Sequence, residues 1–445
     1  MAHISVIPES SFRSGVFPPS AAPSNPGQVL SLTASTFRAL RHHNYRLWAG
    51  ADLVSITGTW MQVLGVNWLV LTITGSATSV GLSLVMQALP TLLLGMWGGA
   101  LADRLPTRPV VVAAQLAQAA LAAVLAVIAL TGVRSPLPIY AVALAGGVVS
   151  ALGGPALGRF GAEVVPREDL PNAMALGSII NSAGRILGMS VAGMMLPLTG
   201  NAVLFAANAL TFFAVIVAVM RMRSSEFHEL AAEKHRPGAV LAGLRYVART
   251  PWLLVLLALS IVLGSLGRNY QVTMAAMSAG PLAAGAGGYG LLSTVFAAGT
   301  VVGGFLAASR PRLTIRLLLI SAFAISVLQA LSGLMPSLAA FAAFMLPIAA
   351  GAILVDTTVS ARAQLDSPDA MRGRVLAALG MAGAASGALG GPVLGWLSDS
   401  FGPRLALQVG GVSCVVATLL AAAALARFRK TATGPAPARV AMENA

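Results

Sequence analysis

One short charged interruption separates two long apolar runs of the sequence: Gly98-Gly99-Ala100-Leu101-Ala102-Asp103-Arg104-Leu105-Pro106-Thr107-Arg108-Pro109. The glycines end the first run, the Asp103–Arg104 pair lies in the gap, and Arg108 and Pro109 open the second run. The gap is too short to fold by itself, whereas each run can cross a bilayer, which takes about 20 apolar residues. The stretch therefore predicts a tight connection between two membrane-spanning helices.

The composition of the whole chain supports this interpretation. Of the 445 residues, 57% are hydrophobic and only 9% are charged, whereas a soluble domain carries about 25% charged residues. Such a chain cannot cover a water-facing surface, so it is an integral membrane protein. The 47 glycines and the low aromatic content of 6% are typical of helices that pack closely through small residues.

The excess of positive charge has a membrane explanation. A net charge of +14 would indicate nucleic acid for a soluble protein, but the basic residues lie in short gaps between apolar runs. We interpret them as topology signals and contacts to anionic membrane lipid, and expect no nucleic-acid partner. The single cysteine, Cys414, excludes an internal disulfide, and the sequence holds no Cys/His cluster for a metal.

Twelve stretches qualify as membrane spans: 46–72, 77–101, 108–131, 137–160, 170–197, 200–221, 252–278, 286–309, 313–333, 337–361, 373–399 and 403–427. The long gap 222–251 divides them six and six, which predicts an all-α membrane protein with bundles over 41–221 and 252–430. We expect disordered tails over 1–40 and 431–445, and the first tail lacks the features of a secretory signal peptide. Within the gap, Gly238–Arg249 forms either an interfacial amphipathic helix or a simple tether.

Positive charge alternates from gap to gap. The gaps after odd-numbered spans carry only Arg134 and Arg404. The gaps after even-numbered spans carry Arg104, Arg108, Arg167, Arg223, Lys234, Arg236, Arg245, Arg249, Arg310, Arg312 and Arg372. Because basic segments stay in the cytoplasm, the pattern predicts an even number of spans with both termini cytoplasmic.

The two halves also resemble each other in sequence. A shift of 203 residues pairs Arg159 with Arg362, Glu163 with Asp366, Gly184 with Gly387, and Gly188 with Gly391. A repeated six-helix half predicts pseudo-symmetry, a central cavity and alternating access.

The opening stretch resembles a motif of the major facilitator superfamily, between its second and third helices. Gly99, Asp103, Arg104 and Arg108 fill the main positions of that motif. The second half, at Gly303–Arg310, lacks the aspartate. The resemblance, which covers about residues 37–430, implies a transporter with twelve helices in two pseudo-symmetric bundles.

Glycine motifs strengthen the resemblance. Gly184, Gly188 and Gly193 are similar to the antiporter motif of the fifth helix, without its proline and one glycine; the copy with Gly387, Gly391, Pro392 and Gly395 is more complete. We expect these glycines to permit close helix packing. The run Gly58–Gln62 and the segment Met371–Val375 resemble the branch with siderophore, macrolide and multidrug exporters.

The resemblance implies export of a small metabolite, siderophore-like compound or drug, driven by proton antiport across the bacterial inner membrane. The alternatives are uptake or facilitated flux, a lysophospholipid flippase, and a non-transporting sensor or assembly partner. The sequence has no nucleotide-binding Gly-x-x-x-x-Gly-Lys-[Ser/Thr] motif, so a gradient must drive transport. We expect a monomer with no cofactor and no enzymatic activity.

The resemblance also implies a gate. Asp103 is expected to close the cytoplasmic end by facing Gly373 and Arg374 at the start of the helix 373–399, whose N-terminus carries positive partial charge. Arg104 and Arg108 would balance that carboxylate or pair with Glu163, Glu168 or Asp169. The alternative is an ordinary loop charge with a role in topology.

Charged and polar residues inside the spans are candidates for the substrate or proton pathway, because burying them in a membrane is costly. Asp52 and Asp356 are the candidate proton carriers; the alternatives are a shallow interfacial position for Asp52 and a pair with Arg362 or Arg374 for Asp356. Arg185 and Arg268 favour an anionic or polar substrate, with structural pairing as the alternative. Trp60 is a candidate for stacking. Further polar candidates are Asn67, Gln87 and Asn181. Asp399, at the outer end of its span, is expected to cap or to pair with Arg404.

Overall fold

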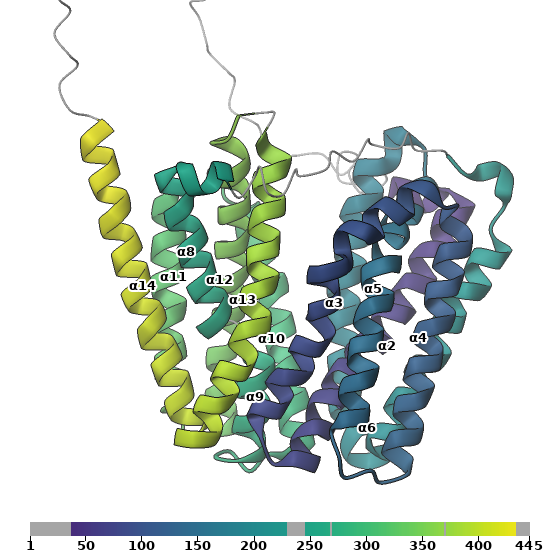
Figure 1. Cartoon of the computed structure of the whole chain (residues 1–445), viewed down its shortest axis with the longest axis horizontal. Coiled ribbons are helices and arrows are strands. Elements are labelled where there is room, and N and C mark those ends of the chain that lie inside the picture. Colours follow the sequence, from purple (N-terminus) through teal and green to yellow (C-terminus); the bar gives the residue numbers. More distant parts are fainter. Residues whose placement is uncertain (1–36, 229–244, 268, 369–370, 433–445) are drawn as a thin grey trace, which may run out of the picture.

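The computed structural model describes residues 37–228, 245–267, 269–368 and 371–432, which form helices and connecting turns. The first bundle consists of α2 (His43–Thr74), α3 (Ala77–Arg104), α4 (Thr107–Leu130), α5 (Leu137–Glu163) and α6 (Leu170–Arg221). The second consists of α8 (Pro251–Leu266), α9 (Tyr270–Ala279), α10 (Gly285–Ala308), α11 (Ile315–Ser332), α12 (Leu338–Leu365), α13 (Arg372–Phe401) and α14 (Pro403–Ala432). Figure 1 shows the two bundles side by side.

The helix α6 contains two membrane spans. As one straight helix, its 52 residues would be about 78 Å long, more than twice the roughly 30 Å core of a bilayer. Gly200 breaks it with a φ of 75°, a left-handed conformation that glycine adopts at little cost. The first bundle therefore has six spans.

The helices α8 and α9 together make one span, which the sequence predicted as a continuous helix over 252–278. The α8 helix ends at Leu266 and α9 begins at Tyr270. Asn269 compensates for part of the break, because its side-chain amide donates to the carbonyls of Gly264 (3.1 Å) and Ser265 (3.0 Å). With α6 counted twice, the described chain has twelve spans in two six-helix bundles, which confirms the predicted fold.

The repeat predicted by the shift of 203 residues is visible as a matching pair of ion pairs. Arg159 binds Glu163 in the last turn of α5, with 2.9 Å between the charged atoms, and Arg362 binds Asp366 at the end of α12. Both pairs have the i,i+4 spacing that joins neighbours on a helix surface. The two halves thus finish equivalent helices in the same way.

The bundles meet mainly through α3 against α13 and α6 against α10. Figure 1 shows α3 and α13 close together at their lower ends and further apart at their upper ends. Between these two helices, Gly391 lies against Gly81 and Gly395 lies against Ala77, so closely that a side-chain carbon on Gly395 would come 2.5 Å from the Ala77 carbonyl oxygen. These glycines allow direct backbone contact between the bundles.

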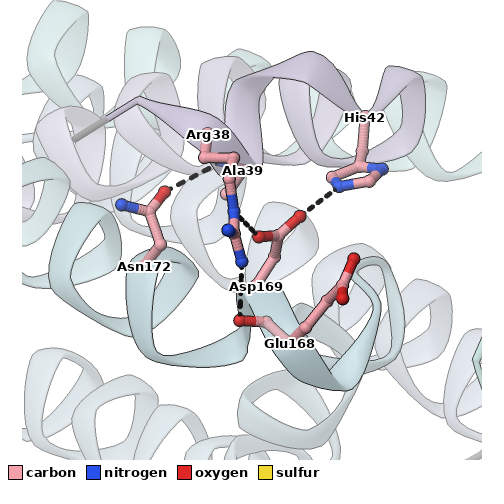
Figure 2. Close-up of polar contacts among 6 residues, drawn as sticks. All are labelled: Arg38, Ala39, His42, Glu168, Asp169 and Asn172. Atoms are coloured by element: carbon pink, nitrogen blue, oxygen red, sulfur yellow. Dashed lines mark hydrogen bonds and ion pairs between the residues drawn. The ribbon is translucent and has the colours of Figure 1, made fainter. Parts of the chain in front are cut away.

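A polar cluster fixes the start of the described chain to the first bundle, as Figure 2 shows. The short helix η1 (Arg38–Arg41) lies beside η2 (Arg167–Asp169). The buried Asp169 carboxylate binds Arg38 and also His42, at 2.7 Å. Ala39 N donates to the Asn172 side chain at 2.9 Å. Asp169 lies outside the spans. Its pKa is held below the usual value of 3.8, mainly by the hydrogen bond from His42.

We expect Asp169→Asn to lower the thermal stability of the first bundle at pH 7. A carboxyl whose folded-state pKa is depressed stabilises the fold at pH values above its unfolded pKa, and this contribution is lost as the pH falls through the folded-state pKa. The difference between wild type and variant should therefore shrink below about pH 3.8. Thermal unfolding in detergent, followed by tryptophan fluorescence, measures it, since Trp48 lies in the adjacent core cluster.

Glu168→Gln is the matched control, because Arg38 uses only the backbone carbonyl of Glu168 and the residue is exposed. A loss of stability in Asp169→Asn that stays the same between pH 7 and pH 3 would contradict the ionic explanation.

The structure covers only parts of the predicted tails and linker. Residues 1–36, 229–244 and 433–445 lie outside the described residues, so most of the predicted helix 238–249 does as well; residues 245–249 are helical. The described chain begins at Phe37, so it includes residues 37–40 of the predicted tail. Within these residues, Arg38 binds Asp169.

Candidate functional site

A cavity of about 310 Å³ lies between the two bundles, lined by α2, α3, α6, α9, α10 and α13. Trp60 and Arg185 line it from the first bundle, and Tyr270 and Phe296 line it from the second. The Tyr270 and Phe296 rings pack with their centroids 4.9 Å apart. The cavity therefore combines one cation with three aromatic rings.

Arg185 is the charged group of this cavity. Its guanidinium carbon lies 5.7 Å from the centroid of the Trp60 ring, within the range of a cation–π interaction. One guanidinium nitrogen donates to Thr300 of α10, in the other bundle. The Nε atom is buried and has no hydrogen-bond partner, and no carboxylate of the described residues pairs with Arg185. The cavity thus holds a cation with an unused donor.

A second cavity, of about 260 Å³, lies inside the first bundle. Asp52 is its only charged lining residue, and no cationic side chain of the described chain pairs with this carboxylate. The remaining polar lining residues are Ser55, Thr59, Gln62, Asn67, Ser83, Gln87, Gln115, Gln118, Ser150 and Asn208. The inner cavity thus holds one carboxylate among amides and hydroxyls.

The two cavities adjoin each other. Leu84 lines both of them. Asn67 lines the inner cavity and donates to Gln271, a lining residue of the central cavity, at 3.3 Å, and to Tyr289 at 3.1 Å. Because Gln271 and Tyr289 belong to the second bundle, the Asn67 amide connects the Asp52 cavity to the opposite wall of the central cavity.

Asp399 joins the two bundles at the contact between α13 and α3. This carboxylate, near the end of α13, accepts hydrogen bonds from the backbone N–H groups of Ala77 (2.7 Å) and Thr78 (3.0 Å) at the start of α3, and from the hydroxyls of Ser76 and Thr78. The first N–H groups of a helix lack partners within it, so Asp399 caps α3. The sequence predicted capping or a pair with Arg404, but did not indicate that the capped helix belongs to the other bundle.

At the opposite end, the predicted gate residues lie apart. Asp103 is exposed and pairs with Arg159 of α5, with 3.7 Å between the charged atoms. No atom outside its own segment lies within 4 Å of the position where Gly373 would carry a side-chain carbon. The contact between Asp103 and the start of α13 near Gly373 and Arg374 is absent from this conformation and stays a prediction.

The basic residues near Asp103 have other partners than those predicted. Arg108 donates to the Val219 carbonyl at 2.8 Å, Glu163 binds Arg159 and Thr107, and Asp169 binds Arg38 and His42. Arg104 is exposed. Two of the carboxylates expected for Arg104 and Arg108, those of Glu163 and Asp169, are thus bound to neighbours within the same bundle.

The glycines of the motifs make two kinds of contact, within the first bundle and between the bundles. Gly184 and Gly188 receive Ile56 and Thr57 of α2 inside the first bundle. Contacts between the bundles are made by Gly193, which faces Gly290, and by Gly391 and Gly395, which face α3. Gly387 lines the central cavity, and Pro392 lies within α13.

Of the predicted pathway residues, the structure brings Trp60 and Arg185 to the central cavity and Asp52, Asn67 and Gln87 to the inner one. Asn181 and Asp356 are exposed and line neither cavity. Arg268 lies outside the described residues. The sequence analysis missed Thr300 and the α4 residues Gln115 and Gln118; two glutamines in an otherwise apolar helix were the signal that could have identified the α4 pair.

Comparison with known proteins agrees with this architecture. A family model described as transmembrane secretion effector matches residues 34–439. The chain belongs to this family of the major facilitator superfamily. Among curated major facilitator proteins, the enterobactin exporter EntS of Shigella flexneri is 27% identical over 402 residues, covering 88% of this chain and 94% of the relative. EntS of Escherichia coli O1:K1 is 26% identical over 408 residues with the same coverage.

Solved structures show the same major facilitator fold. A point mutant of the nucleoside transporter NupG superposes with a TM-score of 0.71 at 14% identity, covering 86% of this chain and all of that one. A bacterial homologue of the human lysosomal transporter Spinster, inward-facing and unoccupied, gives 0.65 at 16% identity, covering 93% of this chain and all of that one. The chain is therefore a multi-pass membrane transporter of this superfamily.

Proposed function

We propose that this transporter exports a small aromatic anion, such as a siderophore-like catecholate or carboxylate, in exchange for protons by alternating access. The observation that carries the proposal is Arg185, a cation in the central cavity with a buried, unbonded donor. An intramembrane arginine needs an anionic partner, and no described carboxylate provides one. The aromatic lining and the enterobactin exporters among the relatives support an aromatic anion as that partner.

Asp52 is the proton carrier in this proposal. It lies in its own cavity, apart from the Arg185 site, so a proton and an anion bind at separate places. The hydrogen bonds of Asn67 to the second bundle offer a route by which a change of charge at Asp52 affects the central cavity. Asp356 is the weaker candidate because it lines neither cavity.

The charge pattern supports a location in the bacterial inner membrane with both termini in the cytoplasm. In that orientation, the end closed by Asp399 faces the periplasm, and the conformation described here is open to the cytoplasm. The predicted contact between Asp103 and the start of α13 then belongs to the opposite conformation, in which the cytoplasmic end is closed.

Flux into inside-out vesicles tests the proposal, with 2,3-dihydroxybenzoate as a labelled aromatic anion. An acidic lumen should drive its accumulation by the wild type. Asp52→Asn should bind the probe without responding to the pH gradient. Flux by the wild type that is independent of the gradient would rule out proton antiport, and binding without any flux would favour a sensor.

A further inference from the structure

A basic groove lies on the outer side of the second bundle, between α11 and α14. It consists of two adjoining hollows of about 370 and 530 Å³, which share Arg316 and Ile320. The first hollow is lined by Arg310, Arg312 and Arg316 around the start of α11. The second is apolar apart from Arg316 and is lined from both helices by Leu319, Ala422, Leu425 and their neighbours. The groove therefore has a positively charged end that continues directly into an apolar end.

The three arginines of this groove have no protein counter-ion. All are exposed, and none forms an ion pair within the described parts of the chain. The equivalent connection in the first half contains Asp103, which pairs with Arg159, whereas Gly303–Arg310 has no acidic residue. The second connection is thus purely cationic, and its charge is available to a ligand.

The position of the groove identifies the kind of ligand. The helix α11 packs against α12 and α14 of its own bundle, and Figure 1 places α11 and α14 on the side of that bundle away from the first one. This side faces lipid in a membrane, where acyl chains fill any apolar groove. The arginines add a preference for the head group, because basic pockets beside transmembrane helices attract anionic lipid.

We propose that this groove binds an anionic phospholipid. The lipid phosphate lies among Arg310, Arg312 and Arg316, and an acyl chain follows the apolar surface between α11 and α14. The site is separate from the central cavity, so it does not depend on the identity of the transported compound. A lipid, rather than a soluble phosphate, is the occupant because a soluble phosphate has no apolar part to contact the apolar half of the groove.

Native mass spectrometry tests the site, with protein released from nanodiscs of mixed phosphatidylglycerol and phosphatidylethanolamine. Wild type should retain phosphatidylglycerol selectively. Each Arg→Gln change at 310, 312 or 316 should reduce that retention by roughly fivefold, since a basic residue near an anionic lipid surface contributes about 1 kcal/mol. Glycerol phosphate at millimolar concentration should not compete, because it lacks the acyl chain.

Arg310→Gln, Arg312→Gln and Arg316→Gln combined remove three charges, and the control removes three charges from the other bundle: Arg46→Gln, Arg167→Gln and Arg221→Gln together, all at exposed positions. It should retain phosphatidylglycerol like the wild type. Equal retention by the groove variants, or equal loss in the control, would overturn the proposal. Competition by glycerol phosphate would instead identify a soluble-anion site and would also overturn it.

Discussion

Arg185→Gln should abolish most transport of an aromatic anion while leaving the protein at least as thermally stable as the wild type. A hydrogen bond to a charged group contributes about 1.5–3 kcal/mol, so the affinity for the anion should fall roughly 10- to 100-fold. Stability should not fall, because the substitution removes a cation that has a buried, unbonded donor and no protein counter-ion among the described residues. Flux in vesicles and thermal unfolding without substrate measure the two effects.

Arg185→Lys separates charge from geometry. Lysine keeps the cation but loses the planar guanidinium that lies over Trp60 and bonds Thr300, so we expect intermediate transport. Arg134→Gln is the matched control, because Arg134 is exposed in the connection after α4 and lines neither cavity. Transport of the anion by Arg185→Gln at the wild-type rate would contradict the proposed site.

The spans could be predicted from the sequence because the bilayer imposes a minimum length and a low polarity on each one. The predicted start of α3 at residue 77 and the start of α5 at residue 137 agree with the structure. The break between α8 and α9 was missed because the polar run Gly267-Arg268-Asn269 is short and lies between long apolar segments, so hydropathy averaged over the length of a span stays high. Hydropathy reports the depth of a residue in the membrane and not the local path of the backbone.

The site was predicted only in part for a related reason. Depth and charge selected Asp52 and Arg185, which line cavities, but they also selected Asp356, which does not. Whether a polar residue faces a cavity depends on the rotation of its helix against its neighbours, and packing across the bundle sets that rotation. The same limit explains Asp399, because its partner on α3 lies more than 300 residues earlier in the chain.

Asp399→Ala should shift the transporter away from the conformation described here. The carboxylate of the second bundle caps α3 of the first, and loss of a helix cap costs about 0.5–2 kcal/mol. If the cap exists only while this end is closed, its whole contribution biases the conformational equilibrium, by roughly 2- to 30-fold. Asp399→Asn should have a smaller effect, because an amide oxygen still accepts hydrogen bonds.

Thiol labelling in a Cys414→Ser background measures this shift, with Ala384→Cys as a reporter in the central cavity. In the wild-type background, an impermeant reagent should label the reporter in inside-out vesicles more readily than in intact cells, and Asp399→Ala should reverse this preference. Asp366→Asn is the control, since Asp366 pairs only within its own bundle. The helices α3 and α13 run antiparallel and each carries an aspartate near its C-terminal end, so Asp399 and Asp103 can cap alternate ends of the same pair. Unchanged labelling in Asp399→Ala would show that the glycine contacts alone hold this end closed.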